Sequence, residues 1–148
     1  GPDVLNQTVT QEAIQQRLIS TQFRNRNLAA LYLDQGFLAG MGNYLRSEIL
    51  FFAGLHPDKK PAHLSDKQIK HLAAQTLQVT YRSYATGGYT RSIAASVCAR
   101  HSVAEYEAQR FMVFDREGLL CRRCNETILR AERSSRRIYF CPQCQGNE

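Results

Sequence analysis

The sequence predicts a mainly α-helical bundle followed by a small β-hairpin that four cysteines hold. Four stretches within the first 80 residues place apolar side chains at the spacing of an amphipathic helix, and two short strand-like stretches lie near the end of the chain. The chain has 148 residues, of which 43% are hydrophobic and 22% charged. These values are typical of a soluble globular domain, or of one domain with a small module attached.

Two helices are predicted before residue 40. The first runs from an N-cap at Thr10 to about Ser20, and the second begins near Asn27 and extends toward Phe37. Three glycines between residues 36 and 42 then interrupt the helical pattern. We therefore expect a region of turns before the third helix.

The third and fourth helices carry recognisable end signals. The third is expected from Asn43 to Ala53, with Gly54 directly after its C-terminus. The fourth begins at a capping box, Ser65–Gln68. Residues 82–108 have only weak helical character, so no element is assigned there.

The character of the sequence changes from Arg110 onward. Phe111–Phe114 is predicted to be a strand and Asp115–Gly118 a turn. Ile128–Arg130 and Ile138–Phe140 are predicted to be the two arms of a hairpin.

Four of the five cysteines form the pattern C-x2-C-x16-C-x2-C, which is typical of a four-thiolate zinc site. The predicted ligands are Cys121, Cys124, Cys141 and Cys144. Two disulfides in a secreted protein are disfavoured, because no secretory leader opens the chain and one cysteine would be left over. We expect one structural Zn²⁺, and we expect the fifth cysteine, Cys98, to be a small buried apolar residue.

The formal net charge is +6, and all nine basic residues after position 99 are arginines. The planar guanidinium suits phosphate, so the charge is compatible with a polyanionic partner. The longest strongly apolar run, Ile49–Ala53, is too short to cross a bilayer, and we expect no membrane span.

Two places in the sequence could bind phosphate. Gly40–Asn43 precedes a helix whose first amides are free and carry partial positive charge, although the segment could also be a plain turn with Asn43 as the N-cap. Arg133–Arg137 puts three arginines and two serines at the hairpin tip, where a solvated charged loop is the alternative. A metal anchor and the aromatic residues Tyr139 and Phe140 behind the tip favour nucleic-acid binding.

Two segments of the chain carry a resemblance to a known family. Leu33–Leu50, continued by Ala53–Pro57, resembles the helix-two-turns-helix motif of the formamidopyrimidine-DNA glycosylase/endonuclease VIII family. The ending, from Phe114–Gly118 through Arg136 to Cys141–Cys144, resembles the C-terminal zinc finger of that family. The run Gly-Asn-Tyr-Leu-Arg within the first segment is more similar to the endonuclease VIII branch.

The resemblance implies a helical helix-two-turns-helix domain over residues 1–108 and a zinc-finger β-hairpin over residues 109–148. It also implies that the chain is the damaged-DNA-binding half of a base-excision repair DNA glycosylase/AP lyase. Such an enzyme flips an oxidised base out of the stack, removes it and nicks the strand. The nucleophile of the family is an N-terminal proline amine beside a glutamate, in a β-sandwich domain that this chain lacks; Pro2 is not terminal. We therefore expect the chain alone to be inactive.

By resemblance, Gly42 and Asn43 hold a DNA phosphate beside the lesion, and Arg136 and Arg137 of the finger contact the DNA. Arg136 also matches the arginine of the elimination step, where holding the departing phosphate is physically easier for a guanidinium than giving up a proton. The expected partners are damaged double-stranded DNA and the N-terminal β-sandwich domain of the same enzyme. We expect a monomer in the bacterial cytoplasm, associated with the nucleoid.

Two other functions remain open from the sequence. One is a stand-alone zinc-ribbon module that binds nucleic acid without enzyme activity, and the other is a zinc-stapled protein-interaction domain. Several further side chains could contact DNA, but solvation or packing is the default expectation for them: Arg24, Arg26, Arg46, Tyr81, Tyr84 and Tyr89. The four histidines share no ligand spacing and are expected at the surface or as caps: His56, His63, His71 and His101.

Overall fold

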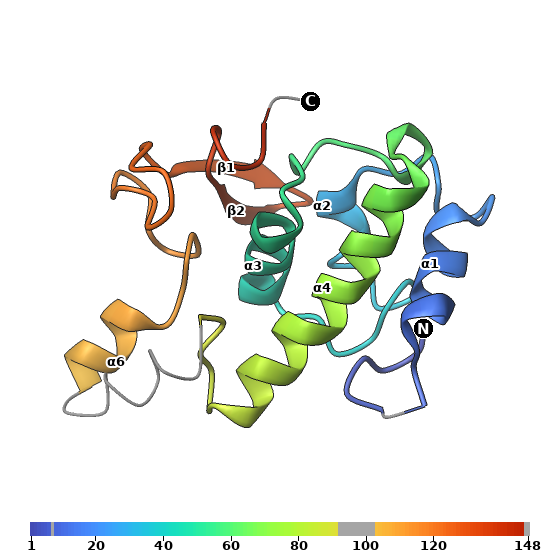
Figure 1. Ribbon diagram of the computed structural model, residues 1–148, viewed down its shortest axis with the longest axis horizontal. Coiled ribbons are helices and arrows are strands. Elements are labelled where there is room, and N and C mark those ends of the chain that lie inside the picture. Colours follow the sequence, from blue (N-terminus) through green and yellow to red (C-terminus); the bar gives the residue numbers. More distant parts are fainter. Residues whose placement is uncertain (7, 92–102, 147–148) are drawn as a thin grey trace.

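The computed structural model describes residues 1–6, 8–91 and 103–146, and within these the fold is mainly helical (Figure 1). The elements in chain order are α1 (Gln11–Ile19), α2 (Leu28–Leu31), α3 (Asn43–Ala53), the 3₁₀ turn η1 (Pro61–His63), α4 (Asp66–Ala85), α6 (Val103–Gln109), β1 (Leu129–Arg133) and β2 (Arg136–Phe140). Cys98 and His101 lie outside the described residues, so the expectations for them stay predictions.

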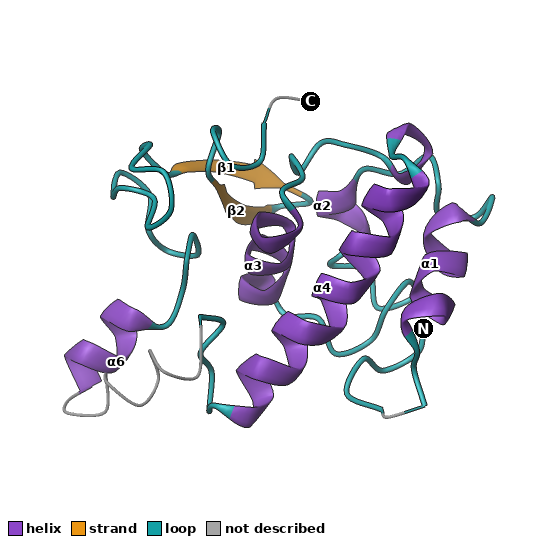
Figure 2. Cartoon of the chain, in the orientation of Figure 1, coloured by secondary structure: helices purple, strands orange, loops and turns teal. Residues whose placement is uncertain are grey.

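Helix α3 links the hairpin to the rest of the helices (Figure 2). It packs against α4 and against β2, while α1 packs against α4. None of the helices in the described ranges is long and apolar enough to cross a membrane.

The helix ends confirm the capping signals of the sequence. Thr10 Oγ1 accepts the amide of Ala13 at 3.1 Å, and Ser65 and Gln68 form both hydrogen bonds of the capping box. Gly54 ends α3 in the left-handed conformation, with φ 71°.

The predicted second helix is wrong in length, since α2 contains only four residues. Asn27 caps it by accepting the amide of Ala30 at 2.9 Å. Asp34 then accepts the amide of Gly36 through its carboxylate at 2.7 Å, and this local turn competes with continuation of the helix. Phe37 is buried as expected, but it reaches the core from a turn.

Two hydrophobic cores meet at α3. The main core joins α1, α3 and α4 and also takes in Ile138 from the hairpin. A smaller core lies beside the cysteines and contains Phe51 of α3, Met112, Val113 and Tyr139. Contacts therefore cross the boundary at residues 108 and 109, and the division into two domains there stays a prediction.

The hairpin has the predicted antiparallel form, with longer strands than expected. Its register pairs Leu129 with Phe140 and Arg133 with Arg136, which leaves Ser134 as the first residue of a two-residue turn. The predicted strand Phe111–Phe114 is wrong: this segment bends, because its amides are bound by a side chain of α3 that is described below.

Candidate phosphate site and metal centre

A cavity of about 530 Å³ lies between the start of α3 and the hairpin tip. It is lined by Arg26, Ala30, Leu33, Asp34, Gln35, Met41, Gly42, Asn43, Ser134 and Arg136. The fold thus brings the predicted residues Gly42, Asn43 and Arg136 together. Arg137 does not line this cavity; it pairs with Glu132 across the hairpin, one residue out of phase with Arg136 and so on the opposite face.

The N-terminus of α3 is open toward the cavity. Its N-cap is Gly42, which offers no side-chain cap, and the first turn of the helix contains no acidic residue. A Cβ added at Gly42 would have no neighbouring atom within 4 Å. Free amides with partial positive charge therefore face a space that an anion can enter.

Helix α3 begins at Asn43 as predicted, so the alternative in which Asn43 is the N-cap is wrong. Its Oδ1 accepts a hydrogen bond from Arg46 Nη2 at 3.0 Å instead of one from a helix amide. Within the described part of the chain, its Nδ2 has no hydrogen-bond partner. Asn43 thus has an occupied acceptor and an available donor at the cavity wall.

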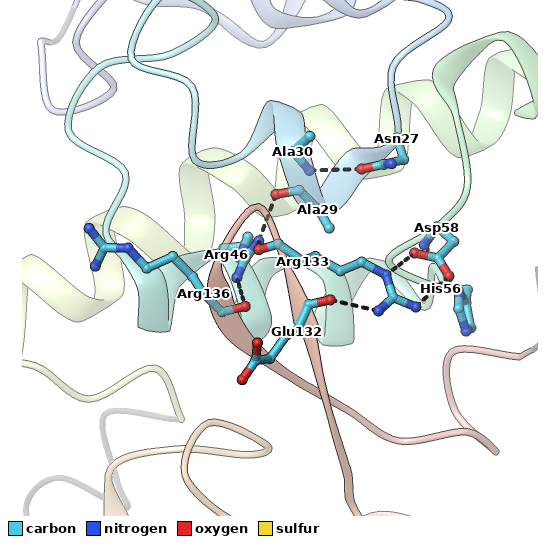
Figure 3. A network of polar contacts seen from close by, with 9 residues as sticks. All are labelled: Asn27, Ala29, Ala30, Arg46, His56, Asp58, Glu132, Arg133 and Arg136. Carbon is cyan, nitrogen blue, oxygen red and sulfur yellow. Dashed lines mark hydrogen bonds and ion pairs between the residues drawn. The ribbon is translucent and has the colours of Figure 1, made fainter.

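Arg46 is fully buried and holds the hairpin tip against α2 and α3 (Figure 3). Its guanidinium donates to carbonyl oxygens of Ala29 at 2.9 Å, Arg133 at 3.2 Å, Arg136 at 3.4 Å and Arg137 at 3.1 Å. Burial, with the nearby charges of Arg136 and Arg133, lowers the pKa of Arg46 to about 10. The sequence left open whether Arg46 is solvated or contacts phosphate. Because its guanidinium is buried and bound to carbonyl oxygens, it does neither.

Arg133 anchors the hairpin on its other side. Its guanidinium donates to both carboxylate oxygens of Asp58, at 2.7 and 2.9 Å (Figure 3). Hydrogen bonding from Arg133 holds the pKa of Asp58 below its ordinary value, against the smaller effect of burial. Because Arg133 is bound to Asp58, Arg136 is the tip arginine that reaches the cavity.

The four predicted cysteine ligands converge at the far end of the hairpin. Their sulfur atoms all lie within 4.8 Å of one another, with 3.8 Å between Cys121 and Cys144 and 3.4 Å between Cys124 and Cys141. Four sulfurs about 2.3 Å from one tetrahedral ion would be separated by about 3.8 Å, so the cluster can hold a single metal ion.

The surroundings lower the pKa of one cysteine thiol and raise the pKa of two others. Burial alone would raise the pKa of Cys121, but hydrogen bonds from the amides of Arg123 and Cys124 and from neighbouring thiols bring it below its ordinary value. Burial raises the pKa of Cys141 and of Cys144. A metal ion would therefore have to displace protons from at least these two thiols.

A buried acid on α3, Glu48, binds the segment that was predicted to be a strand. Its carboxylate accepts the amides of Met112 at 2.7 Å, Val113 at 2.8 Å and Phe114 at 3.0 Å, together with the hydroxyl of Thr90. Three successive amides that point to one carboxylate cannot alternate as they do in a strand. The carboxylate thus replaces a strand partner for this segment.

Gln145 makes a similar connection beside the metal ligands. Its Oε1 accepts the amide of Cys141 at 2.8 Å, and its Nε2 donates to the carbonyl of Leu55 at 3.0 Å. Neither Gln145 nor Glu48 was predicted from the sequence. The only available signal for Glu48 was a charged residue on the apolar face of a predicted helix.

Among the other candidate side chains that the structure describes, only Arg26 lies at the cavity. Arg26 lines the cavity and pairs with Asp34 at 2.6 Å. Tyr89 is buried, in agreement with packing, whereas Tyr84 is 75% exposed. Among the described histidines, His56 accepts the amide of Asp58 through Nδ1 at 3.1 Å.

The fold and these sites define a helical protein with a hairpin whose four cysteines could hold a metal ion and with a cavity lined in part by Arg26 and Arg136. Over residues 1–95 the chain matches the family described as the formamidopyrimidine-DNA glycosylase H2TH domain. The chain therefore belongs to this family of DNA repair glycosylases.

Curated relatives of the chain include bacterial Endonuclease 8 proteins. The one from Klebsiella pneumoniae subsp. pneumoniae is 46% identical over 145 residues, which are 98% of this chain and 52% of the relative. The one from Escherichia coli strain SE11 is 45% identical over the same length and the same shares. The chain thus spans about half the length of the curated relatives it matches.

Solved structures with the same fold include glycosylases bound to DNA. A complex of Lactococcus lactis Fpg with DNA containing an abasic site superposes with a TM-score of 0.76 at 21% identity, covering 99% of this chain and 52% of that one. A complex of the Lactococcus lactis protein with DNA containing FAPY-dG gives a TM-score of 0.75 at 25% identity, covering 99% and 51%.

Proposed function

We propose that this chain is the damaged-DNA-binding half of an endonuclease VIII-like DNA glycosylase/AP lyase that acts on oxidised bases. The relatives named Endonuclease 8 and the Fpg complexes with damaged DNA support this function. The observation that carries the proposal is the cavity in which Gly42 and Asn43, at the start of α3, meet Arg136 of the hairpin.

The segment from α2 to α3 serves as the helix-two-turns-helix motif in this proposal. Two consecutive turns separate the two helices, one directly after α2 and one near Gln35. They direct the N-terminus of α3 toward the hairpin tip. A backbone phosphate beside the lesion accepts hydrogen bonds from the first amides of α3 and from Asn43 Nδ2, while Arg136 neutralises its charge.

Arg136 can contribute to the elimination step by holding the phosphate that departs. A guanidinium stays protonated at neutral pH and presents several donors to phosphate oxygens, so it stabilises developing negative charge without a proton transfer. Arg137, on the other face of the hairpin, would contact the backbone elsewhere or only add to the positive potential.

One structural Zn²⁺ on Cys121, Cys124, Cys141 and Cys144 completes the proposal. The sulfur separations suit the ion, and the amides of Arg123 and Cys144 donate to Sγ of Cys121 and Cys141, which supports thiolate ligands. The ion would fix the base of the hairpin, so that its tip carries Arg136 at a defined position.

The remainder of the enzyme would be an N-terminal β-sandwich domain that supplies the nucleophilic amine and its glutamate. This chain alone would then bind damaged DNA without cleaving it. We place the whole enzyme in the bacterial cytoplasm, associated with the nucleoid, as a monomer.

The binding site is tested by comparing Arg136→Ala with its neighbour Arg137→Ala in the zinc-loaded chain. Affinity for a duplex with a tetrahydrofuran abasic-site analogue is measured at several salt concentrations. Loss of one phosphate contact at Arg136 should weaken binding and reduce the slope of log K against log salt by about 1. Equal slopes for Arg136→Ala and the wild type would contradict the site.

The catalytic assignment is tested by borohydride trapping on DNA with an abasic site. We expect no trapped product with this chain alone, because the amine nucleophile belongs to the other half. Addition of the N-terminal half of the Klebsiella pneumoniae relative should restore the product. Trapping by the chain alone at the level of a full-length enzyme would contradict the assignment.

A further inference from the structure

The turn at the hairpin tip has two features that oppose its own stability. Ser134 and Ser135 have φ values of 55° and 61°, so both adopt the left-handed conformation that L side chains disfavour. Two-residue turns of this kind are normally formed by asparagine and glycine. In addition, Arg133 and Arg136 stand directly opposite each other in the register, and like charges in this position repel.

The surrounding structure imposes this turn on the chain. Arg46 binds the carbonyl oxygens of Arg133 and Arg136, the two residues that flank the serines. Asp58 draws the side chain of Arg133 away from Arg136 through two hydrogen bonds. A strained backbone that the neighbouring structure fixes from both sides is typical of functional sites.

The two serines differ in their relation to the cavity. Ser134 lines it together with Asn43 and Arg136, whereas Ser135 is not part of the lining. Neither hydroxyl forms a hydrogen bond to another described residue, so neither serine is explained by a contact within that part of the chain. Stability alone would favour glycine at both positions.

We infer that Ser134 is a further phosphate ligand, whose hydroxyl donates to the same backbone phosphate that Asn43 and Arg136 hold. This inference rests on the proposed function. The left-handed backbone places Ser134 at the cavity wall next to Arg136, and an uncharged donor adds direction to the charge of the guanidinium. Ser134 thereby selects the position of the phosphate, and Arg136 supplies most of the attraction.

The neighbouring serines provide a matched pair for the test. Ser134→Gly and Ser135→Gly each relieve one strained residue and add the same flexibility to the turn, but only Ser134→Gly removes a hydroxyl from the cavity. Ser134→Asn is the rescue variant, because asparagine tolerates the left-handed conformation and offers an N–H donor. Each zinc-loaded chain is measured for Tm and for affinity to the tetrahydrofuran duplex at several salt concentrations.

We expect both glycine variants to melt at or above the wild-type temperature. Ser134→Gly should weaken binding about 10-fold or more, which is the effect of losing one hydrogen bond to a charged acceptor. Its salt slope should be unchanged, because an uncharged ligand releases no counterions. Ser135→Gly should bind like the wild type, and Ser134→Asn should recover most of the affinity.

Equal affinities of Ser134→Gly and Ser135→Gly would overturn the inference. Arg136→Ala, measured alongside, separates this failure from failure of the proposed function. If Arg136→Ala lowers the salt slope while Ser134→Gly changes nothing, only the role of Ser134 is refuted. If Arg136→Ala also changes nothing, the phosphate site itself is refuted.

Discussion

Replacing Asn43 by aspartate should stabilise the fold and abolish most DNA binding. The expectation follows from the two sides of the Asn43 amide, whose oxygen accepts from Arg46 and whose nitrogen is available at the cavity. Asn43→Asp keeps an acceptor for Arg46 and makes it negative. It also removes the only donor of the side chain and puts a negative charge beside the phosphate.

The size of the stability change can be estimated from Arg46. Its pKa of about 10 corresponds to roughly 3 kcal/mol of destabilisation of the buried charge. A carboxylate at position 43 can offset part of this amount, and a negative group in the first turn of α3 adds about 0.5 kcal/mol. At about 3 °C per kcal/mol for a chain of this size, Tm should rise by several degrees.

The size of the binding change follows from the phosphate. A carboxylate about 4 Å from a phosphate is repelled by about 1 kcal/mol in water and about 4 kcal/mol at the effective dielectric constant of a protein surface. Loss of a hydrogen bond to a charged acceptor adds about 1.5 kcal/mol or more. Affinity for the tetrahydrofuran duplex should therefore fall about 100-fold or more.

Two variants complete this experiment. Asn43→Ala removes both contacts, so it should lower Tm by about 5 °C or more and weaken binding less than aspartate does. Asn27→Asp makes the same charge change at the N-cap of α2, outside the cavity lining, and should bind nearly as well as the wild type. Wild-type DNA affinity of Asn43→Asp, or a Tm below that of Asn43→Ala, would contradict the two roles assigned to the Asn43 amide.

Three further predictions concern the hairpin and the contacts that hold it and the segment before it. A chelator should remove one Zn²⁺ per chain and melt the hairpin while most helical circular dichroism remains, since α1 and α4 belong to the main core; complete unfolding in one step would contradict this. Glu48→Gln should lower the free energy of unfolding by about 2–4 kcal/mol, because an amide cannot accept all the hydrogen bonds that the carboxylate accepts. A Tm within 2 °C of the wild type, which corresponds to under about 1 kcal/mol, would count against the hydrogen bonds from Met112–Phe114 to Glu48. Asp58→Asn should lower Tm at neutral pH, but its difference in Tm from the wild type should vanish at acid pH. Because the folded pKa of Asp58 lies below its ordinary value, the stabilisation by its ion pair with Arg133 is complete above about pH 4 and is lost as pH falls through the folded pKa. A Tm difference that is independent of pH would exclude this ion pair as its source.

Local signals in the sequence were sufficient for the parts of the fold that local hydrogen bonds determine. Thr10, the Ser65 capping box and Gly54 marked helix ends correctly because caps involve residues three or four positions apart. The cysteine spacing likewise predicted the cluster at the base of the hairpin. The joining of Asn43 with Arg136 came from the family resemblance.

The short length of α2 reflects a local turn at Asp34, but two other failures involve side chains that bind backbone far away in the sequence. Arg46 and Glu48 are charged, and their charge alone predicted exposure, although both are fully buried. Their partners are carbonyl and amide groups of the hairpin and of Met112–Phe114, which no pattern of side chains reveals. Asn43 and Arg46 lie only three positions apart, and their contact was missed because Arg46 was expected to be solvated.

The three consecutive polar residues Arg46, Ser47 and Glu48 of α3, all fully buried, set a limit on exchange of parts between related proteins. Arg46 binds hairpin carbonyls, Ser47 accepts the amide of Tyr139, and Glu48 binds the segment that leads into the hairpin. A foreign hairpin whose backbone follows a different path would leave Arg46 and Ser47 without partners, because both bind main-chain groups of the hairpin. The smallest segment that can be transplanted is therefore α3 together with the hairpin, even though Ala53 at the end of α3 and Leu129 at the start of β1 are 76 positions apart.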